Sequence, residues 1–350
     1  MNTLIPFSKE AKSTAELLMQ LKDRGMTVDN DELALDVLNK VNYYRLSGYW
    51  FKFQNKWLKK NPIPADLSAE EKDVLNNLFV VDVSFANIID IYKFDTKLRS
   101  LCLDALEKIE IAIGSDICEH MCNSKGGYWF LDKNNVLPVI KKQKDNTNRE
   151  IFSYEVLLDD IDEVMRRNER TKCIKSFRKK YNNKYPPYWI LSQLITFGTL
   201  SKLYTSLPPE DKKQIAKNIG LNVDIMEKSL QTLAYVRNIC AHYARLWDNE
   251  NSVTPVNIRF NSIERSSKYN YNFHSIGSNT TFFPIFYLIS FYLKNIYPES
   301  KWCNLIVSKI DEYQKKTITK DGVSLVSFKK MGFSENWEKL PLFAEMLQNK

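Results

Sequence analysis

Glycine and proline are scarce in this chain of 350 residues, which contains only 10 Gly and 12 Pro. A turn-rich β protein would need more of both, because these residues adopt the backbone angles of tight turns. Hydrophobic residues make up 44% of the chain, so a large core can form. The composition therefore favours long helices, and we expect an all-α fold.

Long apolar runs are also missing. The most apolar stretch, residues 282–293, is too short to span a bilayer and is interrupted by Pro284. The first ten residues contain no basic segment followed by an apolar one, which argues against a signal peptide. We expect a soluble, cytoplasmic protein that does not bind a membrane.

The six cysteines follow no pattern of paired metal ligands. Cys118 and Cys122 flank His120, but a structural zinc ion needs four ligands, and no second pair stands at a suitable spacing. The thiols are typical of reduced, partly buried cysteines in a cytosolic protein. We predict no metal and no cofactor.

Helical spacing of apolar residues predicts most of the chain's organisation. Gly126 and Gly127 end the longest predicted helix. Residues 141–149 are predicted to form a polar surface loop. Residues 252–279 are predicted to be irregular, with a short strand at 256–260. The predicted helices cover residues 8–24, 31–40, 84–122, 190–207, 226–247, 281–297 and 303–315.

A net charge of +8 is compatible with a polyanionic partner such as nucleic acid. The most basic segment, residues 166–184, has Phe177, Tyr181 and Tyr185 between its cations, and Glu169 is its one acidic residue. Such a run is either a solvated helix face or a phosphate-binding surface. Its cations are Arg166, Arg167, Arg170, Lys172, Lys175, Arg178, Lys179, Lys180 and Lys184.

Residues 41–53 are dense in aromatic side chains and include the RNA-binding candidates Tyr44 and Arg45. One interpretation is a wedge that packs the N-terminal segment onto the core. The other is a surface on which unpaired bases stack.

Arg237 and His242 are the strongest candidates for chemistry, because the chain has only three histidines. An imidazole can move a proton near neutral pH, and a guanidinium can hold a phosphate through a reaction. Together they can cleave RNA through its own 2′-hydroxyl without a metal. His242 would act as general base or acid, and Arg237 would stabilise the phosphoryl oxygens.

Neighbouring residues extend this candidate site. Asn238 would orient the imidazole or bind the RNA backbone, Tyr243 would stack on a base, and Arg245 would contact RNA. Five residues on a helix correspond to about 140° of rotation, so Arg237 and His242 do not share a tight stripe. This suits a cleft shared by two copies of the chain. Alternatively, Arg237 pairs with a carboxylate and His242 is buried in the core.

Five motifs appear in the order found in a known family. Residues 237–247 read Arg-Asn-Ile-Cys-Ala-His-Tyr-Ala-Arg-Leu-Trp, and residues 42–50 read Asn-Tyr-Tyr-Arg-Leu-Ser-Gly-Tyr-Trp. These resemble the signatures of bacterial abortive-infection proteins of the Abi-2 type (AbiD and AbiF). The resemblance also covers residues 94–99 with 105–110, residues 187–189 with 196–201, and residues 331–337.

The resemblance implies a helical bundle of the HEPN superfamily, whose members are often metal-independent ribonucleases. Arg237 and His242 would occupy the Arg-x4-His positions of a homodimeric endoribonuclease in phage defence or a toxin–antitoxin system. A small non-coding RNA would restrain it. We expect an N-terminal helical segment at residues 1–80, the HEPN-like core at 81–310, and a C-terminal extension packed on the core at 311–350.

Two departures from the family pattern stand out. An Arg in place of Gly114 would complete a second Arg/His motif with His120, so this is either a lost position or a coincidence. Modification by nucleotidyl transfer would need Tyr two residues after the His, where Ala244 stands. The alternatives to a nuclease are a non-catalytic RNA-binding protein of the same fold and a helical scaffold. The choice among tRNA, mRNA and phage RNA stays open.

Overall fold

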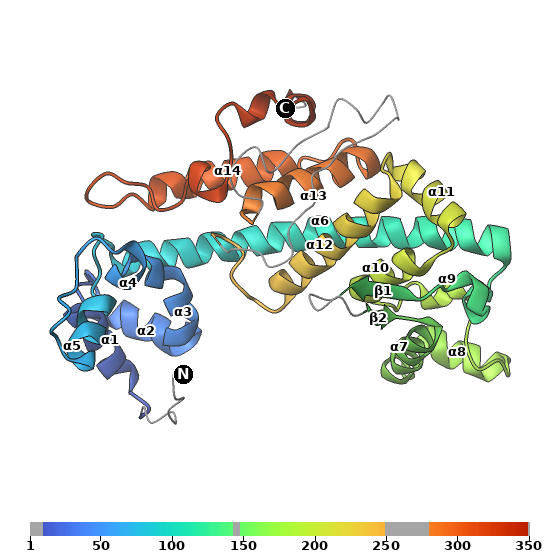
Figure 1. Ribbon diagram of the computed structural model, residues 1–350, viewed down its shortest axis with the longest axis horizontal. Helices are drawn as coiled ribbons and strands as arrows, with labels where there is room; N and C mark the ends of the chain where they lie inside the picture. The colour runs from blue at the N-terminus through green and yellow to red at the C-terminus, as the bar shows by residue number, and fades with distance from the viewer. Residues whose placement is uncertain (1–9, 143–147, 249–279, 349–350) are drawn as a thin grey trace. The chain divides into compact units, whose positions relative to one another are not determined.

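The computed structural model describes residues 10–142, 148–248 and 280–348. Within these ranges it contains fifteen α-helices and one small two-stranded sheet (Figure 1). The prediction of an all-α fold is confirmed. Among the described residues, no helix is long and apolar enough to cross a membrane.

The chain divides into two compact units. Unit 1 comprises Met1–Lys97 and Ser308–Ser327, and unit 2 comprises Leu98–Val307 and Phe328–Lys350. The first division falls within α6 (Phe85–Lys125) and the second within α14 (Trp302–Lys316). The boundaries between the units therefore lie inside helices. These positions differ from the boundaries at residues 80 and 310 that were expected from the sequence.

Unit 1 begins with short capped helices. Ser13 and Ser68 form capping boxes with the glutamates three residues later, which satisfies free backbone N–H groups at two helix starts. Asn30 caps a third helix. The helices are α1 (Thr14–Asp23), α2 (Asp31–Val41), α3 (Tyr43–Trp50), α4 (Asn55–Leu58) and α5 (Ala69–Asn77), with a 3₁₀ turn at Phe51–Phe53.

The aromatic segment at residues 41–53 forms α3 and the turn that follows it. Tyr43, Tyr49 and Trp50 are buried, and the Tyr49 hydroxyl donates a 2.6 Å hydrogen bond to Asp95 Oδ2. Most of the aromatic side chains of the segment are therefore buried, as the wedge interpretation predicts. Tyr44 differs, because its side chain is 75% exposed.

Unit 2 contains the second part of α6 and most of the remaining helices. Its central pair is α10 (Phe197–Ser206) and α12 (Val223–Ala241), and α12 also packs on α11 (Pro209–Ile219) and α13 (Phe282–Ile296). The α13 side chains from Phe282 to Leu293 are all buried, so the most apolar run of the sequence is a core helix. The others are α7 (Tyr154–Arg167), α8 (Lys172–Lys180), α9 (Tyr188–Leu191) and α15 (Pro341–Gln348).

The structure differs from two sequence predictions and leaves a third untested. Antiparallel strands β1 (Val139–Lys142) and β2 (Asn148–Phe152) replace part of the loop predicted at 141–149, because apolar residues flank the polar stretch. The helix predicted at 190–207 is split into α9 and α10, since Thr196 accepts a hydrogen bond from Thr199 N and starts a new helix. The strand predicted at 256–260 lies outside the described residues.

Candidate functional site

The helix that carries the Arg/His motif ends earlier than predicted, at Ala241 instead of Trp247. His242 is the capping residue, Tyr243 N donates to Cys240 O at 3.2 Å, and Ala244 N donates to Ile239 O at 2.9 Å. These two bonds define a Schellman motif, which satisfies the last carbonyls of a helix. Leu246 and Trp247 are buried although they lie beyond the turn. For this reason the apolar spacing in the sequence continues past the end of the helix.

Tyr243 occupies the left-handed position of this turn, with φ +58°. Glycine usually takes this position, because a side chain there clashes with the backbone at a cost of about 1–2 kcal/mol. The Tyr243 ring is 68% exposed, so burial of the ring does not offset that cost. Backbone strain of this kind is concentrated at functional sites, where it holds a side chain in a required position.

His242 lies at the exposed end of α12. The interpretation that places this imidazole in the core is therefore wrong. The side chains of the last turns that are buried are Val236, Ile239 and Cys240. The segment after the turn is held by buried Arg99, whose Nη1 donates to Ala244 O at 3.4 Å. The imidazole is therefore presented to solvent by a firmly anchored backbone.

Arg237 is partly exposed and contacts two polar groups. Its Nη1 donates to Asn238 Oδ1 at 3.3 Å, and its Nε lies 3.9 Å from Glu110 Oε2, with 35% of the side chain exposed. The predicted pairing of Arg237 with a carboxylate is therefore present, but the separation is long for an ion pair. Asn238 contacts the guanidinium, whereas the sequence analysis assigned it to the imidazole or to RNA.

Glu110 is the residue of this site that the sequence analysis missed. It lies on α6, and it also accepts a hydrogen bond from the backbone N–H of Phe197, at the start of α10. Burial raises the pKa of Glu110 and outweighs the opposing effect of Arg237. No sequence pattern connects residues so far apart in the chain, so only the packing of α6 on α10 and α12 reveals the pair.

Arg237 and His242 stand five residues apart at the end of one helix, which corresponds to about 7.5 Å along its axis and about 140° around it. No hydrogen bond joins their side chains to each other within residues 10–142, 148–248 and 280–348. Arg245 is half-buried in the segment just after the turn. One chain thus offers a cation and an imidazole near each other but on different sides of α12.

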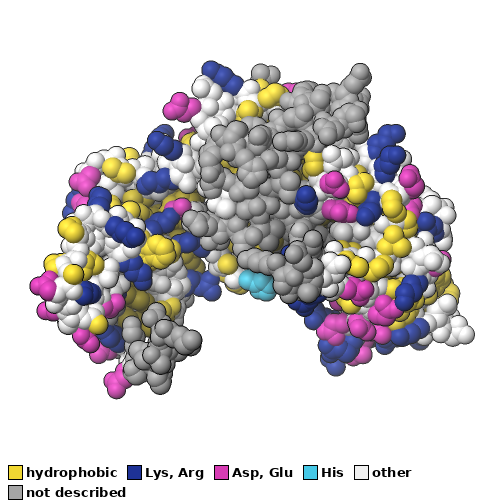
Figure 2. Space-filling view, viewed as in Figure 1, with side chains coloured by type: hydrophobic (Ala, Val, Ile, Leu, Met, Phe, Trp, Pro, Cys, Tyr) yellow, Lys and Arg dark blue, Asp and Glu magenta, His cyan; other side chains and the backbone are white. Residues whose placement is uncertain are grey.

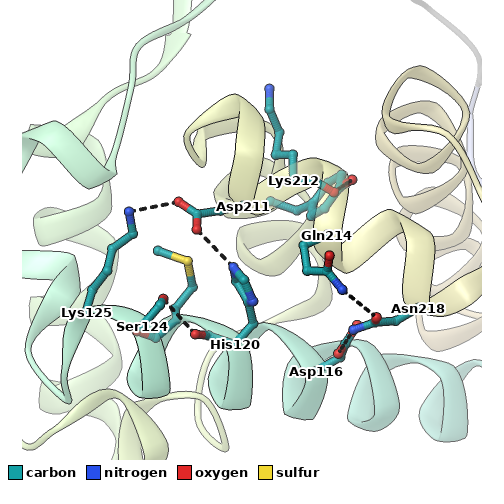
Figure 3. Close-up of polar contacts among 10 residues, drawn as sticks. Asp116, His120, Ser124, Lys125, Asp211, Lys212, Gln214 and Asn218 are labelled. Atoms are coloured by element: carbon teal, nitrogen blue, oxygen red, sulfur yellow. Dashed lines mark hydrogen bonds and ion pairs between the residues drawn. The ribbon is translucent and has the colours of Figure 1, made fainter.

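His120, the second histidine of unit 2, has a different environment (Figure 3). Its Nε2 lies 2.9 Å from Asp211 Oδ1, and Lys125 Nζ lies 2.9 Å from the other oxygen of the same carboxylate. Asp211 is only 8% exposed and lies in the first turn of α11. Nearby, Asn218 donates a 2.7 Å hydrogen bond to Asp116. These contacts tie α11 to the end of α6.

Gly114, the partner that a second Arg/His motif would need, is buried in the middle of α6. A Cβ atom added there would meet Leu200 Cδ2 at 3.8 Å, an ordinary van der Waals contact. The structure therefore accepts an alanine at this position. With Gly at 114 and Asp211 holding the imidazole, His120 has no arginine partner of this kind, and one Arg/His set remains among residues 10–142, 148–248 and 280–348.

The basic segment at residues 166–184 is partly neutralised by the helix that precedes it. Arg166 and Arg167 both pair with Glu163, at 2.6 Å, and Lys184 pairs with Asp162 at 3.1 Å. Figure 2 shows acidic and basic side chains mixed over α7 and α8. The sequence analysis counted Glu169 alone as an acidic partner, so it overestimated the positive electrostatic potential of residues 166–184.

The remaining cations of the segment are exposed on and beside α8. Ile174 and Phe177 fix the buried side of this helix, and Tyr185 is also buried, so of the three aromatics only Tyr181 lies at the surface. No ion pair to these cations is found in the part of the chain that the structure describes. They are Arg170, Lys172, Lys175, Arg178, Lys179 and Lys180.

Among the described residues, no group of three or more His, Cys, Asp or Glu side chains is placed to hold a metal ion. The Cys118 and Cys122 sulfurs lie 3.9 Å apart. Burial and the neighbouring Cys118 raise the pKa of the Cys122 thiol to about 11, so it is protonated at neutral pH.

Comparison with curated proteins and with solved structures finds no match to the chain. The model of the Abi-like protein family matches residues 36–248. This range holds α3, the whole of α6 and the Arg237–His242 turn, so it includes the site and the elements that position it. The chain therefore belongs to the Abi-like family of abortive-infection proteins.

Proposed function

We propose that this protein is a metal-independent endoribonuclease of the HEPN type that acts in phage defence. The observation that carries the proposal is the end of α12, where a strained turn presents His242 and Tyr243 to solvent one turn beyond Arg237. Glycine is the usual residue at the left-handed position of a helix end, and helix packing alone does not call for an exposed imidazole beside it. Membership of the Abi-like family supports the defence role.

In this proposal the RNA supplies its own nucleophile. His242 removes the proton from the 2′-hydroxyl or protonates the 5′-oxygen that leaves, and Arg237 stabilises the charge on the phosphoryl oxygens. The 2′-oxygen bonds to phosphorus as the bond to the 5′-oxygen breaks, which leaves a 2′,3′-cyclic phosphate and a 5′-hydroxyl. Asn238 holds the Arg237 guanidinium through their 3.3 Å hydrogen bond. No metal or cofactor takes part.

Substrate contacts are proposed at three places. Tyr243 and Arg245 border the site, and we propose that the exposed Tyr243 ring stacks on a base. The exposed cations of α8, from Lys172 to Lys180, contact phosphates in unit 2, together with Arg166, Arg167 and Arg170. Tyr44 and Arg45 are exposed on α3 and bind RNA in unit 1.

Assembly and control follow from the geometry of the helix end. Because Arg237 and His242 differ by about 140° around α12, we propose that two copies of the chain combine their helix ends in one cleft. A second set would supply the imidazole and guanidinium for both sides of one phosphate. We further propose that a small non-coding RNA occupies this cleft and restrains the enzyme.

A non-catalytic RNA-binding protein is the second candidate. It is favoured by one observation, that Arg237 already has a carboxylate, Glu110, beside it. In that case the cations of α8 would provide affinity, and the helix end would serve only as a contact surface.

Cleavage of end-labelled RNA in EDTA separates the two candidates. The nuclease proposal expects the wild type to produce 2′,3′-cyclic phosphate ends and the His242→Ala variant to bind RNA without cutting it. Equal RNA binding by both proteins with no cutting by either, in the absence of any restraining RNA, would favour the second candidate. Equal cutting by both would show that His242 is not the catalytic group.

A further inference from the structure

A cavity of about 540 Å³ opens in unit 2 beside the Glu110–Arg237 pair. One wall is α6, from Glu107 to Ser115, and the other comes from residues 192–200, between α9 and the start of α10. Pockets of this size typically hold drug-sized ligands. A nucleobase is smaller, so the cavity has room for one.

The charged groups of the cavity are hydrogen-bond acceptors, and the hydroxyls of Ser115 and Ser192 can donate or accept. Glu107 and Glu110 lie one turn apart on α6, and both carboxylates face the cavity. On the opposite wall, the Gln193 side chain uses its NH₂ group to donate to Trp189 O at 3.1 Å, which leaves its carbonyl oxygen as an acceptor. The two carboxylates therefore favour a ligand that offers N–H donors.

The remaining lining of the cavity is largely apolar. Ile111, Ile195 and Leu200 line the space, and Gly114 adds no side chain. Ile111 is 57% exposed, so its side chain offers apolar surface at the mouth of the cavity. An aromatic ring that slides over this surface would bury apolar area while its edge meets the acceptors.

Guanine is the base that fits this combination. Its Watson–Crick edge presents two adjacent donors, N1–H and the N2 amino group, which match the two oxygens of one carboxylate, as a guanidinium does. Adenine and cytosine each offer one amino group next to an acceptor, and uracil offers a single N–H. In each of these three bases, a hydrogen-bond acceptor would face one of the carboxylate oxygens, and the two negative atoms would repel each other.

Glu107 is the carboxylate available for this contact. Within the described residues it makes no hydrogen bond and no ion pair, whereas Glu110 is engaged by Arg237 and by Phe197 N–H. Because Arg237 lies beside Glu110 at the edge of the cavity, a phosphate on Arg237 and a base against Glu107 would belong to the same nucleotide. The negative charge of the cavity excludes the phosphate itself.

We infer that this cavity binds the guanine base next to the phosphate held by Arg237, with Glu107 recognising the N1–H and N2 amino edge. The inference rests on the proposed ribonuclease function and deepens it, because it gives the enzyme a preference for cutting beside guanosine. Glu107 is thus a specificity residue and takes no part in the chemistry.

Direct binding of nucleotides tests the inference without requiring cleavage. Calorimetry on the full chain in EDTA would compare guanosine 3′-monophosphate with the adenosine, cytidine and uridine 3′-monophosphates. We expect the guanosine nucleotide to bind at least tenfold more tightly than the other three. Glu107→Gln and the cavity-filling Ser115→Phe should each remove this preference. Glu119→Gln, a change of an exposed glutamate on the same helix, should preserve it.

Three results would overturn the inference. The first is equal affinity for all four nucleotides, and the second is a guanosine preference that survives both Glu107→Gln and Ser115→Phe. The third is tighter binding of N-acetyl-arginine amide, which would show that the cavity takes a guanidinium side chain of a protein partner. A guanosine preference that depends on Glu107 in a chain that cuts no RNA would uphold the base site and reject the nuclease proposal.

Discussion

His242 and His120 both lie in unit 2, at the ends of α12 and α6. The surroundings of the two imidazoles differ in exposure, in polar partners and in backbone strain. His242 is exposed, follows an arginine on its own helix, and precedes a strained tyrosine. His120 is held by a buried aspartate that is bound by a lysine as well. Tight pairing secures the packing of helices, whereas loose pairing beside backbone strain leaves groups ready to bind a ligand.

The largest expected effect concerns the guanidinium. Arg237→Ala should lower the rate of RNA cleavage about 10²–10³-fold, the cost of removing one group that stabilises charge in a transition state. Arg237→Lys should recover only part of that loss, since an ammonium lacks the planar fork that matches a phosphate. Single-turnover cleavage measures both. If Arg237→Ala cleaved RNA at the wild-type rate, Arg237 would not be part of the catalytic site.

The packing region should respond in stability instead. Asp211→Ala leaves His120 and Lys125 without their shared partner, and we expect a loss of about 2 kcal/mol in the free energy of unfolding, less than for a fully buried pair. Urea unfolding measures this change. The control is Asp104→Ala, which removes only the exposed pair with Lys108 and should cost less than about 0.5 kcal/mol. Equal effects of the two changes would contradict the distinction.

The strain at Tyr243 gives a prediction of opposite sign. Tyr243→Gly should raise the free energy of unfolding by about 1 kcal/mol, because glycine adopts a φ of +58° without the clash of a side chain. The same change should weaken RNA binding, since the stacking ring is lost. A variant that is less stable than the wild type would show that the ring is held by contacts that outweigh the strain.

Gly114 provides a smaller test in the middle of α6. Gly114→Ala should stabilise the chain by up to about 1 kcal/mol, because alanine restricts the unfolded backbone and its Cβ would meet Leu200 at an ordinary 3.8 Å. Thermal unfolding measures the gain. Destabilisation would mean that α6 and α10 pack more closely than these distances indicate.

The smallest expected effect is a pH dependence at the loose pair. The folded pKa of Glu110 lies above its usual 4.5, so the folded chain binds more protons than the unfolded chain, and ionisation of Glu110 destabilises it as pH rises through that window. Glu110→Gln cannot ionise. Between pH 4 and pH 7, the unfolding free energy of Glu110→Gln should therefore rise relative to that of the wild type, by less than about 1 kcal/mol because the carboxyl group is partly exposed. An unchanged difference would contradict the raised pKa.

The sequence predicted the elements of the site better than its geometry. The helical class and the course of α2, α6, α13 and α14 follow from apolar spacing. The end of α12 was placed too late, because Leu246 and Trp247 continue the apolar pattern and the usual glycine signal is replaced by Tyr243.

Partners from distant segments could not be predicted. Glu110 meets Arg237 and Asp211 meets His120 only because separate helices pack together, and a sequence without an alignment carries no signal for such pairs. The same reason explains Glu163, which neutralises Arg166 and Arg167 from outside the basic run. Spacing along the chain indicates which groups are present, whereas packing decides which of them are already occupied.

The most direct test of the account measures RNA cleavage in EDTA and thermal unfolding on the same two variants, His242→Ala and His120→Ala. The account predicts that His242→Ala loses cleavage by at least 10²-fold with an unchanged unfolding temperature, and that His120→Ala keeps cleavage but unfolds at a lower temperature. The opposite pattern, with cleavage lost in His120→Ala and kept in His242→Ala, would contradict the assignment of the site to the end of α12.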